Sequence, residues 1–93
     1  METIQVLGRT LVLVEILAND MKVYKTVITQ PGMQLEAYFN QTAINPWILH
    51  ARSSEGFLGL VECRTLESAV ARIREELAYE IARRQTLLSE LGT

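Results

Sequence analysis

The sequence predicts an α+β domain, in which an antiparallel β-meander of four to five strands is followed by one long C-terminal α-helix packed on the sheet. Up to residue 64, short apolar or alternating segments are separated by turn residues, a pattern typical of strands. After Cys63 and Arg64 the apolar period changes to about 3.6 residues, which is typical of a helix. The 93 residues have the length of one domain, with a sheet portion over residues 1–64 and a helix over residues 65–92.

The N-terminal part of the chain contains two predicted strand regions and one turn. Residues 4–17, IQVLGRTLVLVEIL, form an apolar run in which Gly8 marks a bend or bulge. Residues 18–20, Ala-Asn-Asp, form a turn, because Asn and Asp tolerate left-handed backbone conformations. Residues 21–29, MKVYKTVIT, alternate in side-chain character with a period of two, as expected of a strand.

The middle of the chain continues the meander. Pro31 and Gly32 predict a type II turn over residues 30–34. The segment SSEG at residues 53–56 has the length of a hairpin loop, and residues 40–46 form a longer connection. The remaining predicted strands are LEAYFNQ at residues 35–41, WILHAR at residues 47–52 and FLGLVECR at residues 57–64.

The last predicted hairpin allows one arrangement of catalytic groups to be tested, a Cys–His dyad. Its expected register pairs Arg52 with Phe57, His50 with Gly59, Leu49 with Leu60 and Trp47 with Glu62. In this register Cys63 shares a face with His50 but lies opposite Pro46. At 3.3 Å per residue the two side chains are about 13 Å apart, beyond hydrogen-bond reach. We therefore expect Cys63 to be a small buried apolar residue.

The C-terminal helix has clear start and stop signals. Thr65 is the predicted N-cap, because its hydroxyl can accept a hydrogen bond from an unpaired backbone N–H. Glu67 lies in the first turn, where the helix dipole favours an anion. Gly92 follows the last apolar residue, as expected of a C-terminal stop. Such a helix is about 39 Å long at 1.5 Å per residue.

The apolar stripe of this helix is interrupted by charge. Glu80 and Arg84, an i,i+4 pair in the favourable order, lie near the middle of the stripe. Because a strand is usually only about 17–20 Å long, a sheet cannot cover the whole helix. We expect the first four turns to pack on the chain's own sheet and the last two to bury their leucines against another chain. The stripe comprises Leu66, Ala69, Val70, Ile73, Leu77 and Ile81, and continues with Leu87, Leu88 and Leu91.

Two other environments are open to these leucines: they could fold back onto their own domain, or the helix end could fray. The sheet gives separate support for self-association, since TLVLVEIL and FLGLV are apolar on both faces. The chain has no second helix to cover the other face. A homodimer that packs two sheets or exchanges helices would supply the cover.

Composition and charge argue against several classes of function. Nine basic and eleven acidic residues give a formal net charge of −2, so the chain presents no basic field for nucleic acid or anionic lipid. No apolar stretch reaches the roughly 18 residues of a membrane span. The N-terminus lacks the basic start and the cleavage site of a signal peptide. The single cysteine allows no intramolecular disulfide, and we expect a cytoplasmic protein.

The chain also has few side chains that could serve in catalysis or bind a metal. The chain has one His, one Cys and one Asp, whereas a structural zinc site uses four ligands. His50 and Asp20 lie in different predicted hairpins, which argues against a Ser-His-Asp arrangement. Glu75 and Glu76 are adjacent on the helix and do not face each other. No glycine-rich phosphate loop joins a strand to a helix. We expect no catalytic residue, no cofactor, no metal and no enzymatic activity.

His50 and Arg52 share one face of their predicted strand, with Trp47 on the other. They form either a polar rim at a strand end or a recognition patch for an anionic or peptide partner.

The segment GFLGLVECRTLESAVARIREEL locally resembles the core of HicB-type antitoxins. Thr65, Leu66, Glu67 and Ala69 match that family's strand, Thr-Leu-Glu helix start and Ala-rich amphipathic helix. The resemblance covers about 22 residues and implies a strand followed by a capped helix. Those antitoxins usually add a DNA-binding segment that is not recognisable here, so their function is not carried over. The predicted order of strands and helix also resembles single-stranded nucleic-acid binders of the PC4 and Whirly type.

The main functional hypothesis is a non-catalytic homodimeric interaction or regulatory module that binds another protein. Its predicted interaction residues are Leu87, Leu88 and Leu91, with Glu80 and Arg84 setting the register. One alternative is a single-stranded nucleic-acid binder that stacks bases on Tyr24, Tyr38 and Trp47 and uses Arg52, Arg72 and Arg83. Another is a small-molecule or enzymatic site between protomers, near His50.

Overall fold

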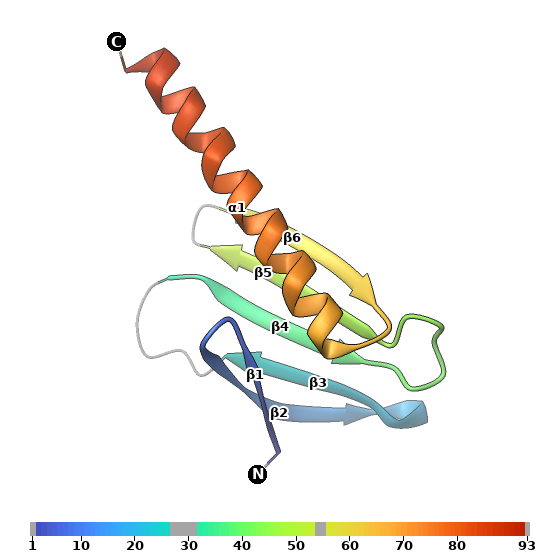
Figure 1. The fold of residues 1–93 in the computed structure, drawn as a ribbon. Helices are drawn as coiled ribbons and strands as arrows, with labels where there is room; N and C mark the ends of the chain where they lie inside the picture. The colour runs from blue at the N-terminus through green and yellow to red at the C-terminus, as the bar shows by residue number, and fades with distance from the viewer. Residues whose placement is uncertain (1, 27–31, 54–55, 93) are drawn as a thin grey trace.

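A computed structural model describes residues 2–26, 32–53 and 56–92. It contains a six-stranded antiparallel sheet with the strands in chain order, followed by a C-terminal helix (Figure 1). This confirms the predicted α+β class and meander, although the predicted four to five strands are too few. The elements are β1 (Thr3–Val6), β2 (Arg9–Leu17), β3 (Met21–Thr26), β4 (Gln34–Phe39), β5 (Trp47–Ser53), β6 (Gly56–Cys63) and α1 (Leu66–Leu91).

The additional strand arises from a tight turn within the first apolar run. Leu7 and Gly8 have φ of 52° and 74°, and Val6 pairs with Arg9 across them. Positive φ at both central residues is the conformation of a type I′ hairpin turn, which suits the twist of the flanking strands. Gly8 therefore marks a full reversal of the chain and not the predicted bend, and the run divides into β1 and β2.

The next predicted turn lies where expected. Asn19 and Asp20 have φ of 64° and 58° within one turn of 3-10 helix at Ala18–Asp20. Short polar side chains can stabilise such left-handed conformations by bonding to nearby backbone. Parts of the predicted 30–34 turn, of the predicted 21–29 strand and of the 53–56 loop lie outside the described residues.

A β-bulge changes the register that the sequence predicts for the last hairpin. Arg52 does pair with Phe57, but the next pair is Ala51 with Gly59, so Leu58 is an extra residue in β6. Beyond this bulge the predicted register is wrong by one residue. The observed pairs are His50 with Leu60, Leu49 with Val61, Ile48 with Glu62 and Trp47 with Cys63.

The corrected register also separates His50 from Cys63 more completely. Cys63 pairs with Trp47, three residues before His50, so the two side chains lie on opposite faces of the sheet. The expectation that they share a face is wrong, because the bulge reverses the alternation. Cys63 is only 7% exposed and belongs to the core, as predicted for a small apolar residue.

The hydrophobic core lies between α1 and one face of the sheet. Ala69 and Ile73 are the buried residues of the helix, and the core cluster to which they belong includes buried side chains from all six strands. Gly59 allows the helix to approach β6 closely, because an added Cβ would lie 3.3 Å from both Glu76 Cβ and Ile73 Cδ1. The buried strand residues of this core are Val6, Leu11, Tyr24, Leu35, Ala37, Leu49, Ala51, Val61 and Cys63.

Helix α1 begins and ends at the predicted signals. The Oγ1 atom of Thr65 accepts a hydrogen bond from the Ser68 N–H at 3.1 Å, and the Gly92 N–H donates to the Leu88 carbonyl at 2.7 Å. The helix contacts β5 and β6 with its first half, and Figure 1 shows its second half extending past the end of the sheet. The 26-residue helix is about 39 Å long, so much of its surface lies outside the core.

Candidate interaction site

The projecting half of α1 carries the three leucines predicted to form an interaction surface, Leu87, Leu88 and Leu91. Leu87 is 44% exposed, Leu88 69% and Leu91 83%. At 100° per residue these side chains point to the same side of the helix as the buried Ile73. The apolar stripe therefore runs on past the sheet, and its last members face a region that no described part of the chain fills.

The surroundings of Ile81 differ from those predicted from the apolar stripe. It was expected to pack on the sheet, but it is 56% exposed. The last apolar helix residue that packs against the core is Leu77, one turn earlier. The prediction failed because periodicity gives the side of the helix and not the point at which the sheet ends.

A groove of about 440 Å³ lies where the helix leaves the sheet. Met33 and Leu58 line it from the sheet, and Leu77 and Ile81 line it from the helix. Gly32, Ser53, Glu80 and Arg84 complete its lining. The groove thus has an apolar wall on each side and lies next to the exposed leucines on the same helix.

The charged interruption of the stripe is a cluster of three residues. Glu80 Oε1 accepts hydrogen bonds from Arg83 Nη2 at 2.7 Å and from Arg84 Nε at 3.2 Å, and its Oε2 accepts one from Arg83 Nε at 3.3 Å. The Arg83 guanidinium, with a smaller effect from Arg84, holds the pKa of Glu80 below its ordinary value. The Glu80–Arg84 pair was predicted, but Arg83, the stronger partner, was not.

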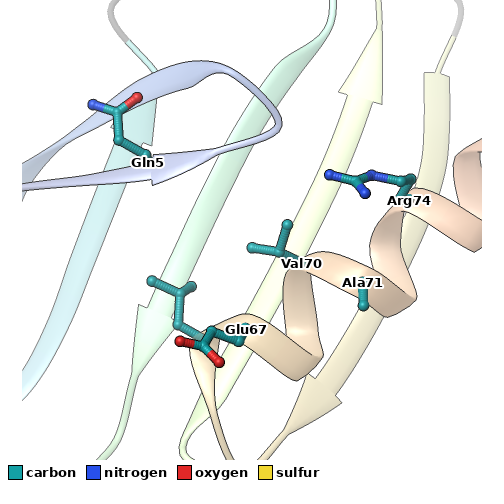
Figure 2. Close-up of a pocket in the computed structure, with 6 residues that line it drawn as sticks. Gln5, Glu67, Val70, Ala71 and Arg74 are labelled. Atoms are coloured by element: carbon teal, nitrogen blue, oxygen red, sulfur yellow. The ribbon is translucent and has the colours of Figure 1, made fainter.

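A second groove lies near the N-terminal end of α1. Figure 2 shows Glu67, Val70, Ala71 and Arg74 of α1 opposite Gln5 of β1. Its volume is about 330 Å³, and Leu66 completes the lining. Glu67 and Arg74 carry opposite charges, so this groove offers no single charge for an ionic ligand. This groove was not predicted, because β1 was not recognised as a separate strand in the first apolar run.

His50 and Arg52, the predicted recognition rim, lie on the sheet face opposite α1. Two residues bind the Arg52 guanidinium. Its Nη2 lies 3.0 Å from Glu36 Oε1, and its Nε donates a hydrogen bond to Gln34 Oε1 at 3.2 Å. Glu36 is only 8% exposed, and its Oε2 accepts a hydrogen bond from the Tyr38 hydroxyl at 2.7 Å. This bond raises the pKa of Tyr38.

The Glu36 network was missed because it joins neighbouring strands. Alternation alone places Glu36 and Tyr38 on one face, but only the β4–β5 register brings Arg52 and Gln34 together. His50 is turned toward Phe57, with the ring centroids 5.5 Å apart. Arg52 is thus already paired, which favours a structural role for it over recognition.

The aromatic residues proposed for base stacking do not form one exposed surface. Trp47 packs on Phe39 with ring centroids 4.7 Å apart and on Tyr24 at 6.1 Å, on the helix-covered face. Tyr24 is buried there, and burial, followed by Glu2, raises the pKa of its hydroxyl to about 12. Tyr38 lies on the opposite face. The arrangement therefore gives no support to the predicted stacking set.

Residues 2–26, 32–53 and 56–92 contain no cluster of three or more His, Cys, Asp or Glu side chains that could hold a metal ion. Within the same described ranges, α1 lacks the sustained apolar stretch that a membrane-spanning helix requires. No family model, no curated protein and no solved structure matches the chain.

Proposed function

We propose that the protein is a small non-catalytic interaction or regulatory module that forms a homodimer through the projecting half of α1. The observation that carries this proposal is the continuation of the core-facing stripe into Leu87, Leu88 and Leu91, beyond the sheet. Full burial of one leucine side chain is worth about 1.5–3 kcal/mol. A contact that covers three of them has a substantial driving force.

A second chain is a better cover for these leucines than the chain's own domain. Leu88 still forms a backbone hydrogen bond to Gly92, so the helix is intact to its end. Folding the leucines back would break several backbone hydrogen bonds in its last turns. Small domains also bury a low fraction of their surface and gain stability from association.

The charged residues next to the exposed leucines are compatible with a binding contact. Glu80 is ion-paired with both Arg83 and Arg84, and Arg83 is 53% exposed, so the Glu80 carboxylate would not enter the contact as an isolated charge. The net charge of −2 favours a protein partner over nucleic acid. We propose a cytoplasmic location, which the single cysteine, unable to form an intramolecular disulfide, supports.

The test is the double substitution Leu88→Lys/Leu91→Lys, measured by sedimentation velocity. Both side chains are exposed, so we expect a folded monomer, whereas the unsubstituted protein sediments as a dimer. Gln85→Lys/Ser89→Lys adds the same charge to the solvent side of the helix end and should leave the dimer intact. A Leu88→Lys/Leu91→Lys variant that still dimerises would contradict the proposal. An unsubstituted protein that is monomeric would contradict it as well.

A further inference from the structure

We infer that the second groove, near the N-terminal end of α1, binds a dipeptide-sized zwitterion, with the ligand's ammonium at Glu67 and its carboxylate at Arg74. This groove lies on the half of the helix that packs on the sheet, away from the exposed leucines, so the inference does not depend on the proposed homodimer. It adds a small ligand to the proposed regulatory role. The lining residues are Gln5, Leu66, Glu67, Val70, Ala71 and Arg74.

The two charged side chains stand on one side of α1 with an apolar surface between them. Glu67 and Arg74 are seven residues apart, so at 100° per residue they point to within about 20° of each other. Val70 and Ala71 come between them on the same side, and Figure 2 shows Val70 in this position. The groove therefore has a negative end, an apolar middle and a positive end.

Neither charge is neutralised by the described part of the chain. Within residues 2–26, 32–53 and 56–92, no ion pair includes Glu67 or Arg74. The two residues stand about 10.5 Å apart along the helix axis and are not paired with each other. Both are thus available to a ligand that carries the opposite charges.

The spacing of the two charges sets the size of the ligand. A charge-assisted hydrogen bond at each end takes about 2.8 Å, which leaves about 5 Å between the nitrogen and the carboxylate of the ligand. A peptide spans at most about 3.5 Å per residue, so a single α-amino acid is too short and a dipeptide is long enough. The groove volume of about 330 Å³ lies at the lower end of the range for ligand sites, which suits a ligand of this size.

The apolar middle of the groove is held by the fold. Leu66 and Val70 are partly buried and pack against the hydrophobic core. On the β1 side, the Gln5 amide donates a hydrogen bond to Thr10 Oγ1 at 2.9 Å, so Gln5 offers the groove mainly its aliphatic part. We therefore expect the ligand to place an apolar side chain on Val70, while the two charges set its orientation.

The test is a titration of the full chain with alanylleucine, followed through the backbone amide signals of Val70 and Ala71 in NMR spectra. N-acetyl-alanylleucine lacks the ammonium, and alanylleucine amide lacks the carboxylate. We expect the unmodified dipeptide to bind at least about tenfold more tightly than either blocked form, since each of them loses one charge-assisted hydrogen bond. Free leucine, which cannot span both charges, should bind as weakly as the blocked forms.

Two variants assign the charges to their residues. Glu67→Gln should bind alanylleucine and its N-acetyl form equally, and should still discriminate against the amide. Arg74→Gln should do the reverse. Glu75→Gln and Arg72→Gln remove the same charges outside the groove lining and should keep both preferences. Circular dichroism checks that each variant folds, and the blocked peptides test the inference on the unsubstituted protein as well.

Three results would overturn the inference: no shift of the two signals at about 10 mM dipeptide, blocked forms or free leucine that bind as tightly as the dipeptide, or preferences that survive Glu67→Gln and Arg74→Gln. The Leu88→Lys/Leu91→Lys variant separates this site from the homodimer, because it should be monomeric and still bind alanylleucine with unchanged affinity. A monomeric unsubstituted protein that binds the dipeptide would remove the homodimer and leave the ligand site standing.

Discussion

The two halves of α1 carry the same apolar stripe in opposite surroundings. In the first half, Ala69 and Ile73 are fully buried against the sheet. In the second half, Leu88 and Leu91 are mostly exposed, although they point to the same side of the helix. A stripe of this period shows that a helix face is made for apolar contact. It does not show whether the contact lies within the chain or with another chain.

The difference depends on what lies beneath each half. Under the first half are small residues, Ala51 and Gly59, which let the helix axis come close to the strands. Under the second half the sheet has ended, and Glu80 with its two arginines marks the boundary. The charged cluster thus separates a stretch that stabilises the fold from one that is available for association.

The largest expected effect comes from truncating the buried half. Ile73→Ala should lower the free energy of unfolding by about 2–5 kcal/mol, because it removes a fully buried side chain and leaves a cavity. Leu88→Ala, a truncation of similar size in the exposed half, should change it by less than about 0.5 kcal/mol. Urea unfolding, at a concentration where the protein is monomeric, measures both. Equal losses would contradict the division of α1 into two halves.

A smaller effect is expected where the buried half touches the sheet. Gly59→Ala should destabilise the protein by about 1–3 kcal/mol, because the new methyl group overpacks against Glu76 and Ile73. Gly32→Ala is the matched control, since an added Cβ at Gly32 meets no atom within 4 Å. Thermal unfolding compares the two variants. If Gly59→Ala proves no worse than Gly32→Ala, the close approach of α1 to β6 is not needed.

The smallest effect concerns the boundary between the halves. The lowered pKa of Glu80 means that its ion pairs contribute fully above the ordinary carboxylate pKa, about 4.3, and are lost as the pH falls through the lowered value. Helicity at 222 nm should therefore decrease slightly more on acidification in the unsubstituted protein than in Glu80→Gln. Because Glu80 and Arg83 are close to solvent, added salt should reduce the difference. Identical titrations of the two proteins would show that the cluster does not hold the helix end.

The sequence was sufficient to predict the elements whose signals are local. The period change after Arg64 and the capping chemistry of Thr65 placed α1 to within one residue, because both depend on neighbours along the chain. The β1–β2 hairpin was missed, since Leu7 is an unusual residue for a backbone with positive φ. The register of β5 and β6 was wrong beyond Arg52, because the position of a bulge depends on how two strands pack.

The candidate site was predictable only to the extent that it lies on one helix. Leu87, Leu88, Leu91, Glu80 and Arg84 could be selected by helical spacing. The groove could not be predicted, because Met33 and Leu58 come from distant segments that only the folded sheet brings beside α1. The ion pair between Arg83 and Glu80 was missed, because Arg83 lies beside the apolar stripe and was not considered as a partner for a residue within it.

The buried position of Cys63 at the end of β6, in the core, gives the protein an internal reporter of motion. Cys63 belongs to the core that α1 and the sheet form together, so a thiol reagent reacts when that core opens. The rate of alkylation, compared with that of an unfolded chain, then gives the free energy of this local opening. As the only thiol in the chain, it reports on the docked half of α1 without any engineered label.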